Sequence, residues 1–106
     1  MENPNKAIQY IINTAPLYAQ AKGQRMYLEE MRKSVKARLM KSCSETVLGK
    51  QEIYAYAHPD YIEILEGIKV AVEQEETYRW MMTAAQARVE VWRTTQFTAR
   101  AEMKNL

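Results

Sequence analysis

Three arginines and a glutamine recur at seven-residue intervals near the end of the chain: Arg79, Gln86, Arg93 and Arg100. On a helix this spacing forms one stripe, because seven residues are close to two turns. Guanidinium groups are planar donors that suit phosphate oxygens, and a nearby ring such as Trp80 can stack on an unpaired base at about 1–3 kcal/mol per base. The stripe therefore predicts either a contact with single-stranded nucleic acid or the solvated face that a long helix needs.

Charged residues are also sorted along the chain. Residues 22–41 hold seven basic and two acidic residues, a net charge of +5, and residues 60–76 hold six acidic residues against Lys69, a net charge of −5. Either the two segments face each other in an antiparallel hairpin, or the basic segment is exposed and tracks a phosphate backbone. Under the second interpretation the predicted nucleic-acid contacts are Lys33, Lys36, Arg38, Lys41, Arg79, Trp80, Arg93 and Arg100.

No set of residues has the spacing of a catalytic or metal site. His58 has no second ligand at a suitable distance in the sequence, and Cys43 is the only cysteine, whereas a zinc site needs several such ligands. The acidic residues within 73–76 have no histidine or nucleophile to act with, and Gly49-Lys50 lacks the upstream glycine of a phosphate-binding loop. We therefore expect no enzyme activity, no metal and no cofactor.

The composition favours a single all-α domain spanning residues 1–106. Hydrophobic residues make up 47% of the 106 residues and charged residues 26%, with only three glycines and three prolines. Residues with β-branched side chains never form an alternating run, so strands are not predicted. The lone Cys43 favours a reducing compartment. No apolar run approaches ~18 residues and the N-terminus has no signal-peptide pattern, so we expect a cytoplasmic protein without a membrane contact.

Residues that start or interrupt helices, above all proline, predict the helix boundaries. Asn3-Pro4 is typical of a helix start, and Pro16 predicts a break after a short helix at about residues 4–13. A long helix is expected at about residues 15–43, followed by a connection at about 44–58. His58-Pro59-Asp60 then predicts the start of a last helix at about residues 59–103.

Apolar residues form stripes along both long helices. In the first long helix the stripe comprises Leu17, Ala21, Leu28, Met31, Val35 and Leu39; in the last it comprises Tyr61, Leu65, Ile68, Val72, Met82, Ala85, Val89, Trp92, Ala99 and Met103. A helical pattern much longer than 25 residues suggests a coiled coil or a long hairpin. An antiparallel hairpin covers only part of the longer stripe, so we expect a homo-oligomer. The predicted interface consists of Leu65, Ile68, Val72, Met82, Ala85, Val89 and Trp92.

Two segments resemble small helical proteins of tailed bacteriophages: LYAQAKGQRMYLEEMRKSVKARL at residues 17–39 and YRWMMTAAQARVEVWRT at residues 78–94. The first segment is also similar to the recombination mediator of T4-like phages, where a tyrosine-containing helix leads into a basic segment, here ending in Lys36-Ala37-Arg38-Leu39. This resemblance implies a multimeric protein that binds single-stranded DNA and helps to load a recombinase past single-strand-binding protein. It also implies the cytoplasm of a host cell as the location.

These observations leave two main hypotheses. The first is a phage recombination or replication accessory that binds single-stranded DNA as a homo-oligomer and helps to load a recombinase or annealing protein. The second is a helical adaptor or inhibitor that docks on a host or phage protein through its apolar stripe and has no nucleic-acid activity. A structural component of a virion is a third possibility. None of these hypotheses involves a small-molecule substrate.

Overall fold

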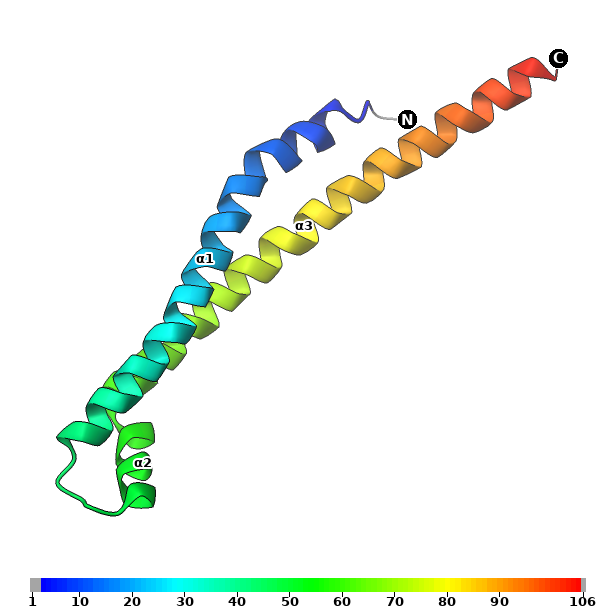
Figure 1. Cartoon of the computed structure of the whole chain (residues 1–106). Coiled ribbons are helices and arrows are strands. Elements are labelled where there is room, and N and C mark those ends of the chain that lie inside the picture. Colours follow the sequence, from blue (N-terminus) through cyan, green and yellow to red (C-terminus); the bar gives the residue numbers. More distant parts are fainter. Residues whose placement is uncertain (1–2, 106) are drawn as a thin grey trace. The chain divides into compact units, whose positions relative to one another are not determined.

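The computed structural model describes residues 3–105 and consists of three helices (Figure 1). They are α1 (Asn5–Ser42), α2 (Leu48–Ala57) and α3 (Pro59–Lys104). No strand occurs among these residues, so the predicted all-α class is confirmed. None of the described helices is both long enough and apolar enough to cross a membrane.

Helix α1 continues through Pro16, where the sequence predicted a break between a short and a long helix. A proline inside a helix removes one backbone hydrogen bond, here the bond to the carbonyl of Ile12. Both Pro16 and Ile12 are exposed, so water can reach that carbonyl. The flanking Thr14 is only 5% exposed. Packing on either side of the proline therefore holds the helix together across the missing bond.

Side chains just before two of the helices accept hydrogen bonds from their first backbone N–H groups. Asn3 caps α1, since its Oδ1 accepts a hydrogen bond from the backbone N–H of Asn5 at 2.8 Å. At the start of α3 the backbone N–H of Asp60 donates to Nδ1 of His58 at 3.0 Å. The segment at about 44–58 that was expected to be a connection contains the ten-residue helix α2.

The chain divides into two compact units that share both long helices. The central unit comprises Gln20–Glu75, and the terminal unit comprises Met1–Ala19 with Glu76–Leu106. The sequence predicted a single domain, because composition and length carry no signal for such a division.

The core of the central unit lies where α2 meets the end of α1 and the start of α3 (Figure 1). It contains Val35, Leu39, Ala55 and Tyr61, with Met40 and Ile64 packed against it. Ala55 is completely buried, which allows α2 to approach closely. The ring of Tyr56 meets that of Tyr61 edge to face, with centroids 5.3 Å apart. Short and aromatic side chains together thus anchor α2.

Buried and half-buried residues recur in a heptad pattern along both long helices. On α1 the pattern comprises Ala7, Ile11, Thr14, Tyr18, Ala21, Arg25, Leu28, Arg32, Val35 and Leu39, and on α3 it comprises Tyr61, Ile64, Ile68, Ala71, Glu75, Tyr78, Met82, Ala85, Val89 and Trp92. Every described residue of these two helices that is buried belongs to this set, which we call the seam. Alternating steps of three and four residues are typical of coiled-coil packing.

The predicted apolar stripe of α3 was wrong in phase within the central unit. Leu65 and Val72 are 40% and 36% exposed, whereas Ile64 is half-buried and Ala71 is 2% exposed. The seam steps by three residues from Tyr61 to Ile64, whereas the prediction stepped by four to Leu65. The same error placed Leu17 in the stripe of α1, where it is 45% exposed.

Candidate nucleic-acid interface

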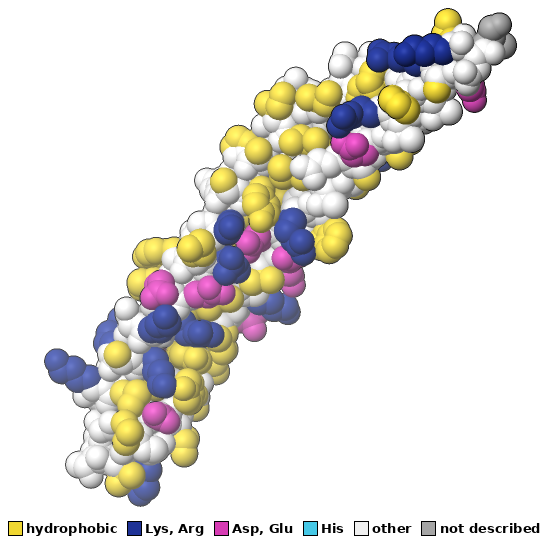
Figure 2. All heavy atoms as spheres, turned by 45° about the vertical axis from the view of Figure 1, so that its right-hand side comes forward, with side chains coloured by type: hydrophobic (Ala, Val, Ile, Leu, Met, Phe, Trp, Pro, Cys, Tyr) yellow, Lys and Arg dark blue, Asp and Glu magenta, His cyan; other side chains and the backbone are white. Residues whose placement is uncertain are grey.

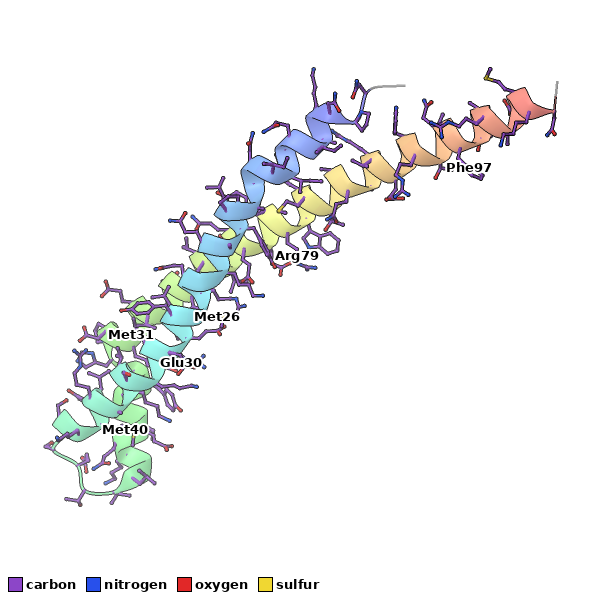
Figure 3. All side chains as sticks on the ribbon, turned by 45° about the horizontal axis from the view of Figure 1, so that its top comes forward. Met26, Glu30, Met31, Met40, Arg79 and Phe97 are labelled. Carbon is purple, nitrogen blue, oxygen red and sulfur yellow. The ribbon has the colours of Figure 1, made fainter. Side chains whose placement is uncertain are left out.

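Four exposed side chains share one face near the end of α3: Arg93, Phe97, Arg100 and Lys104. We call them the C-terminal basic face. Their spacings of four, three and four residues keep them within about 60° around the helix axis. Phe97 is 75% exposed, and in Figure 3 its side chain points away from the ribbon of α3. An unpacked aromatic ring is thus flanked by guanidinium groups on both sides.

The two arginines of this face are available to a ligand. Nη1 of Arg93 contacts Oε1 of Glu90 at 3.1 Å, but both side chains are about two-thirds exposed, at 67% and 66%, so the pair is weak. In the described part of the chain no ion pair engages Arg100 or Lys104. Arg93, Phe97 and Arg100 also border one surface hollow of about 470 Å³.

Arg79 and Trp80 were predicted to bind nucleic acid, and in the structure they contact each other. The guanidinium carbon of Arg79 lies 4.6 Å from the centre of the Trp80 ring, and Nη2 of Arg79 lies 2.6 Å from Oε2 of Glu76. Arg79 is labelled in Figure 3. Trp80 remains 59% exposed. Arg79 is therefore already paired, and Trp80 keeps free ring surface.

The four predicted basic residues of α1 do not form one face. At about 100° per residue, Lys33 and Lys36 lie on a different side of the helix from Arg38 and Lys41. Lys33 pairs with Glu30 at 3.1 Å, and Nη2 of Arg38 lies 3.6 Å from Asp60. The structure therefore spreads these charges around α1.

Lys36 is engaged with α2. Its Nζ lies 4.7 Å from the centre of the Tyr56 ring, and a hydrogen bond to Tyr56 raises the pKa of Lys36 above its ordinary value. Both contacts stabilise the charged ammonium group. Lys36 thus contributes to the attachment of α2 to α1.

An ion-pair network in the seam of the central unit was missed by the sequence analysis. Nη2 of Arg25 donates to Oε1 of Glu75 at 3.2 Å, Nε of Arg25 donates to the other oxygen of Glu75, and Nη1 donates to Glu29 at 3.0 Å. The Arg25 side chain is 24% exposed and that of Glu75 is 10% exposed. The hydrogen bonds to Glu75 and Glu29 raise the pKa of Arg25. The heptad register of two oppositely charged residues was the signal that could have revealed this pair.

The salt bridges also give the direction of the helices within the central unit. Arg25 pairs with Glu75, and Arg38, further along α1, pairs with Asp60 at the start of α3. The order of the paired residues is therefore opposite on the two helices within this unit. Oppositely charged side chains of residues 22–41 and 60–76 meet there.

The central unit also contains an open groove of about 890 Å³. Apolar residues of α1 and α3 line it, among them Leu28, Val35, Ile64 and Val70. Gly67 lies in the groove as well, and a Cβ atom there would be 3.4 Å from Cδ1 of Leu28. We refer to this feature as the central groove.

The residues predicted to join chains lie in different environments. Leu65 and Val72 are exposed, whereas Ile68, Met82, Val89 and Trp92 are half-buried seam residues. Ala85 is only 6% exposed, and it borders a cavity in the terminal unit together with Ala7 and Tyr10. Ala85 is thus covered from within its own chain and offers no surface to another.

Within residues 3–105 no group of three or more His, Cys, Asp or Glu side chains is placed to hold a metal ion. The charged side chains instead lie among hydrophobic ones on the molecular surface, as on the face drawn in Figure 2. No protein-family model, curated protein or solved structure matches the sequence. The arguments on function therefore start from the surface features described above.

Proposed function

We propose that this protein self-associates and binds single-stranded DNA through the C-terminal basic face. The observation that supports the proposal is the exposed ring of Phe97 between Arg93 and Arg100 on one side of α3. Basic groups that neutralise phosphates beside a ring that stacks on a base are the combination used by proteins that bind single strands. Paired bases in a duplex are already stacked on each other and do not offer such a face.

In this proposal most of the affinity comes from charge. Arg93, Arg100 and Lys104 contact phosphates and release counterions, so binding falls as salt rises. Phe97 adds stacking on one base, at about 1–3 kcal/mol. The ring needs no rearrangement to do so, because it is already exposed.

The complete fold we propose is a long antiparallel hairpin of α1 and α3. Each unit supports it separately. In the central unit the salt bridges of Arg25 and Arg38 run in opposite order along α3. In the terminal unit residues 3–7 share a cavity with residues 87–91, and residues 6–10 share another with residues 81–88, which is again the opposite order.

The cellular role we attach to this activity is that of a phage recombination or replication accessory, which helps to load a recombinase or annealing protein on single-stranded DNA. The similarity of residues 17–39 to the recombination mediator of T4-like phages supports this role. The cytoplasm of the host cell is the corresponding location.

The proposal is tested by titrating a labelled single-stranded oligonucleotide at about 50 and about 200 mM salt. We expect binding at the lower concentration and a loss of affinity on the order of tenfold at the higher one, since about three phosphate contacts are released. Phe97→Ala should weaken binding by about fivefold or more, because stacking is lost. An unlabelled duplex should compete less well than an unlabelled single strand, by about fivefold or more, because it offers phosphates but no unstacked base. Absence of binding at about 50 mM salt would refute the proposal.

A second candidate function is a helical adaptor that binds another protein. It is favoured by exposed apolar side chains of α3 outside the central groove, where Ile62 is 47% and Leu65 is 40% exposed. Under this alternative Leu65→Asp abolishes capture of the partner, whereas Arg93→Glu with Arg100→Glu leaves it unchanged. Under the DNA-binding proposal, the same two changes have the opposite effects on oligonucleotide binding.

A further inference from the structure

The central groove has the features of a site for an amphipathic helix. Leu28, Ile64 and Val70 give it an apolar lining. Gly67 adds no side chain to this lining, and Leu28 of α1 packs beside it, since a Cβ atom at Gly67 would lie 3.4 Å from Cδ1 of Leu28. The lining of α3 extends from Asp60 to Gln74, which corresponds to about 21 Å along a helix. The groove therefore accommodates roughly four turns of a helix.

The rim of the groove is acidic. Asp60, Glu63 and Glu66 line it against a single basic residue, Arg38, so three acids and one base leave a net charge of −2. Asp60 is paired with Arg38 at 3.6 Å. Glu63 and Glu66 are exposed and enter no ion pair with any residue that the structure describes. The groove thus favours a helix that carries both apolar and basic side chains.

The last turns of α3 have the matching properties. Residues 93–104 contain three basic residues and Glu102, a net charge of +2. Two large apolar side chains in this segment are exposed, Phe97 at 75% and Met103 at 73%. The segment is about 17 Å long, which fits the length of the groove. Charge, apolar surface and length therefore all agree.

The segment that fills the groove must come from a second copy. Two parts of one uninterrupted helix cannot pack on each other, and α3 is continuous from Pro59 to Lys104. Two C-terminal segments are also poor partners for each other, because both are positively charged. Where the heptad pattern continues past Trp92 it offers only Gln96, Ala99 and Met103, which is a small contact.

We propose that the central groove of one copy binds the C-terminal segment, residues 93–104, of a second copy. The contact is head to tail, so it generates a ring when it closes and a filament when it does not. The inference rests on the proposed function, because the same basic face then binds either the groove or DNA. Single-stranded DNA and the groove of a second copy consequently compete for the basic face. In the oligomer the groove covers this face, and a bound DNA strand replaces the groove.

The test measures the mass of the purified full chain by light scattering over a range of concentrations. We compare the parent chain with two variants. Glu63→Lys/Glu66→Lys reverses the charge of the groove, and Arg93→Glu/Arg100→Glu reverses the charge of the C-terminal segment. Each variant alone should associate at least tenfold more weakly than the parent chain. Mixed together they should associate again in alternation, because the groove of each variant is then opposite in charge to the segment of the other.

Combining all four substitutions should restore self-association, since the charges are then exchanged between groove and segment. Glu30→Lys/Glu45→Lys is the matched control, because it makes the same change in net charge at two side chains that are 74% and 50% exposed and lie outside the groove; it should associate like the parent chain. Helix content and thermal midpoint, followed by circular dichroism, establish that each variant is folded. A parent chain that stays monomeric, or groove variants that associate as the parent does, overturns the proposal.

The competition has a separate readout. The groove variant Glu63→Lys/Glu66→Lys keeps the basic face and should bind a single-stranded oligonucleotide as a monomer, and the oligonucleotide should dissociate oligomers of the parent chain. If the variant binds no DNA but association is restored when the charges are exchanged, the proposed DNA binding is wrong and the proposed docking of the segment in the groove is supported. If it binds DNA while the parent chain never associates, the docking fails alone.

Discussion

At the scale of single residues, the seam is defined as much by its polar members as by its apolar ones. Arg25 and Glu75 face each other at heptad positions of α1 and α3 and are largely removed from water. A charged pair in such a position costs desolvation energy, and its best-attested role is to fix the register of a helix pair. A shift by one heptad would separate Arg25 from Glu75, and Arg25 would keep only its contact with Glu29 on its own helix.

Removing the carboxylate of Glu75 should therefore destabilise the protein. Glu75→Gln keeps one acceptor oxygen but removes the negative charge and the second oxygen to which the partly buried guanidinium of Arg25 donates. We expect the thermal midpoint to fall by about 5 °C or more. Glu30→Gln is the control, because it breaks the exposed Glu30–Lys33 pair, which should change the midpoint by about 2 °C at most. Equal effects of the two substitutions would contradict a role for the buried pair.

The contact between Lys36 and Tyr56 should give a stabilisation that depends on pH. The pKa of Lys36 is raised above its ordinary value of 10.5, so the charged form stabilises the fold. That contribution is complete below about pH 10.5 and is lost as the pH rises through the raised pKa. Tyr56→Phe removes the phenolic oxygen and should lower the urea midpoint below pH 10. The difference between the two proteins should shrink at higher pH, and a difference that grows would show that the assignment is wrong.

At the scale of elements, local sequence signals predicted one helix boundary correctly and another wrongly. The expected start of the last helix at residue 59 agrees with α3, because His58-Pro59-Asp60 acts within one turn. Pro16 is also a local signal, but the seam residues around it pack and keep α1 continuous. A local pattern cannot reveal a stabilisation that comes from another helix.

The phase of the seam was unpredictable for a related reason. Thr14, Arg25 and Glu75 occupy covered positions, whereas Leu65 and Val72 are apolar and exposed. A search for apolar residues alone therefore follows the wrong face of α3 in the central unit. Only the pairing of α1 with α3 decides which face is covered.

Two leucines test this phase directly. Leu39 is 5% exposed in the core of the central unit and Leu65 is 40% exposed on α3. We expect Leu39→Ala to lower the free energy of unfolding by about 3 kcal/mol, through lost burial and a cavity. Leu65→Ala should cost about 1 kcal/mol or less, because the side chain already contacts water. Urea denaturation measures both values, and a loss at Leu65→Ala as large as that at Leu39→Ala would support the predicted apolar stripe of α3 over the seam.

At the scale of the whole molecule, the charge pattern separates two kinds of basic residue. Several basic residues of the central unit have partners within it: Arg25 is paired with Glu75, Arg38 with Asp60 and Lys36 with Tyr56. At the end of α3, Arg100 and Lys104 enter no ion pair in the described part of the chain. The net charge of +2 for the chain hides this difference.

The division explains which part of the candidate site could be predicted. Arg93 and Arg100 were identified from their seven-residue spacing, which holds on any helix. Lys36 contacts Tyr56 of α2, and Arg38 contacts Asp60 at the start of α3. Both partners are distant in the sequence, so the sequence alone did not indicate these contacts. Phe97 was not among the predicted site residues, because an aromatic residue on a long helix is more often part of a core.

The most direct test of the central claim compares two double charge reversals in one oligonucleotide-binding experiment at about 50 mM salt. Arg93→Glu/Arg100→Glu removes the C-terminal basic face, and Lys22→Glu/Lys50→Glu makes the same change in net charge at two exposed lysines elsewhere. We predict that the first variant loses at least tenfold more affinity for single-stranded DNA than the second. Equal losses would mean that net charge alone governs binding, and would contradict a specific face on α3.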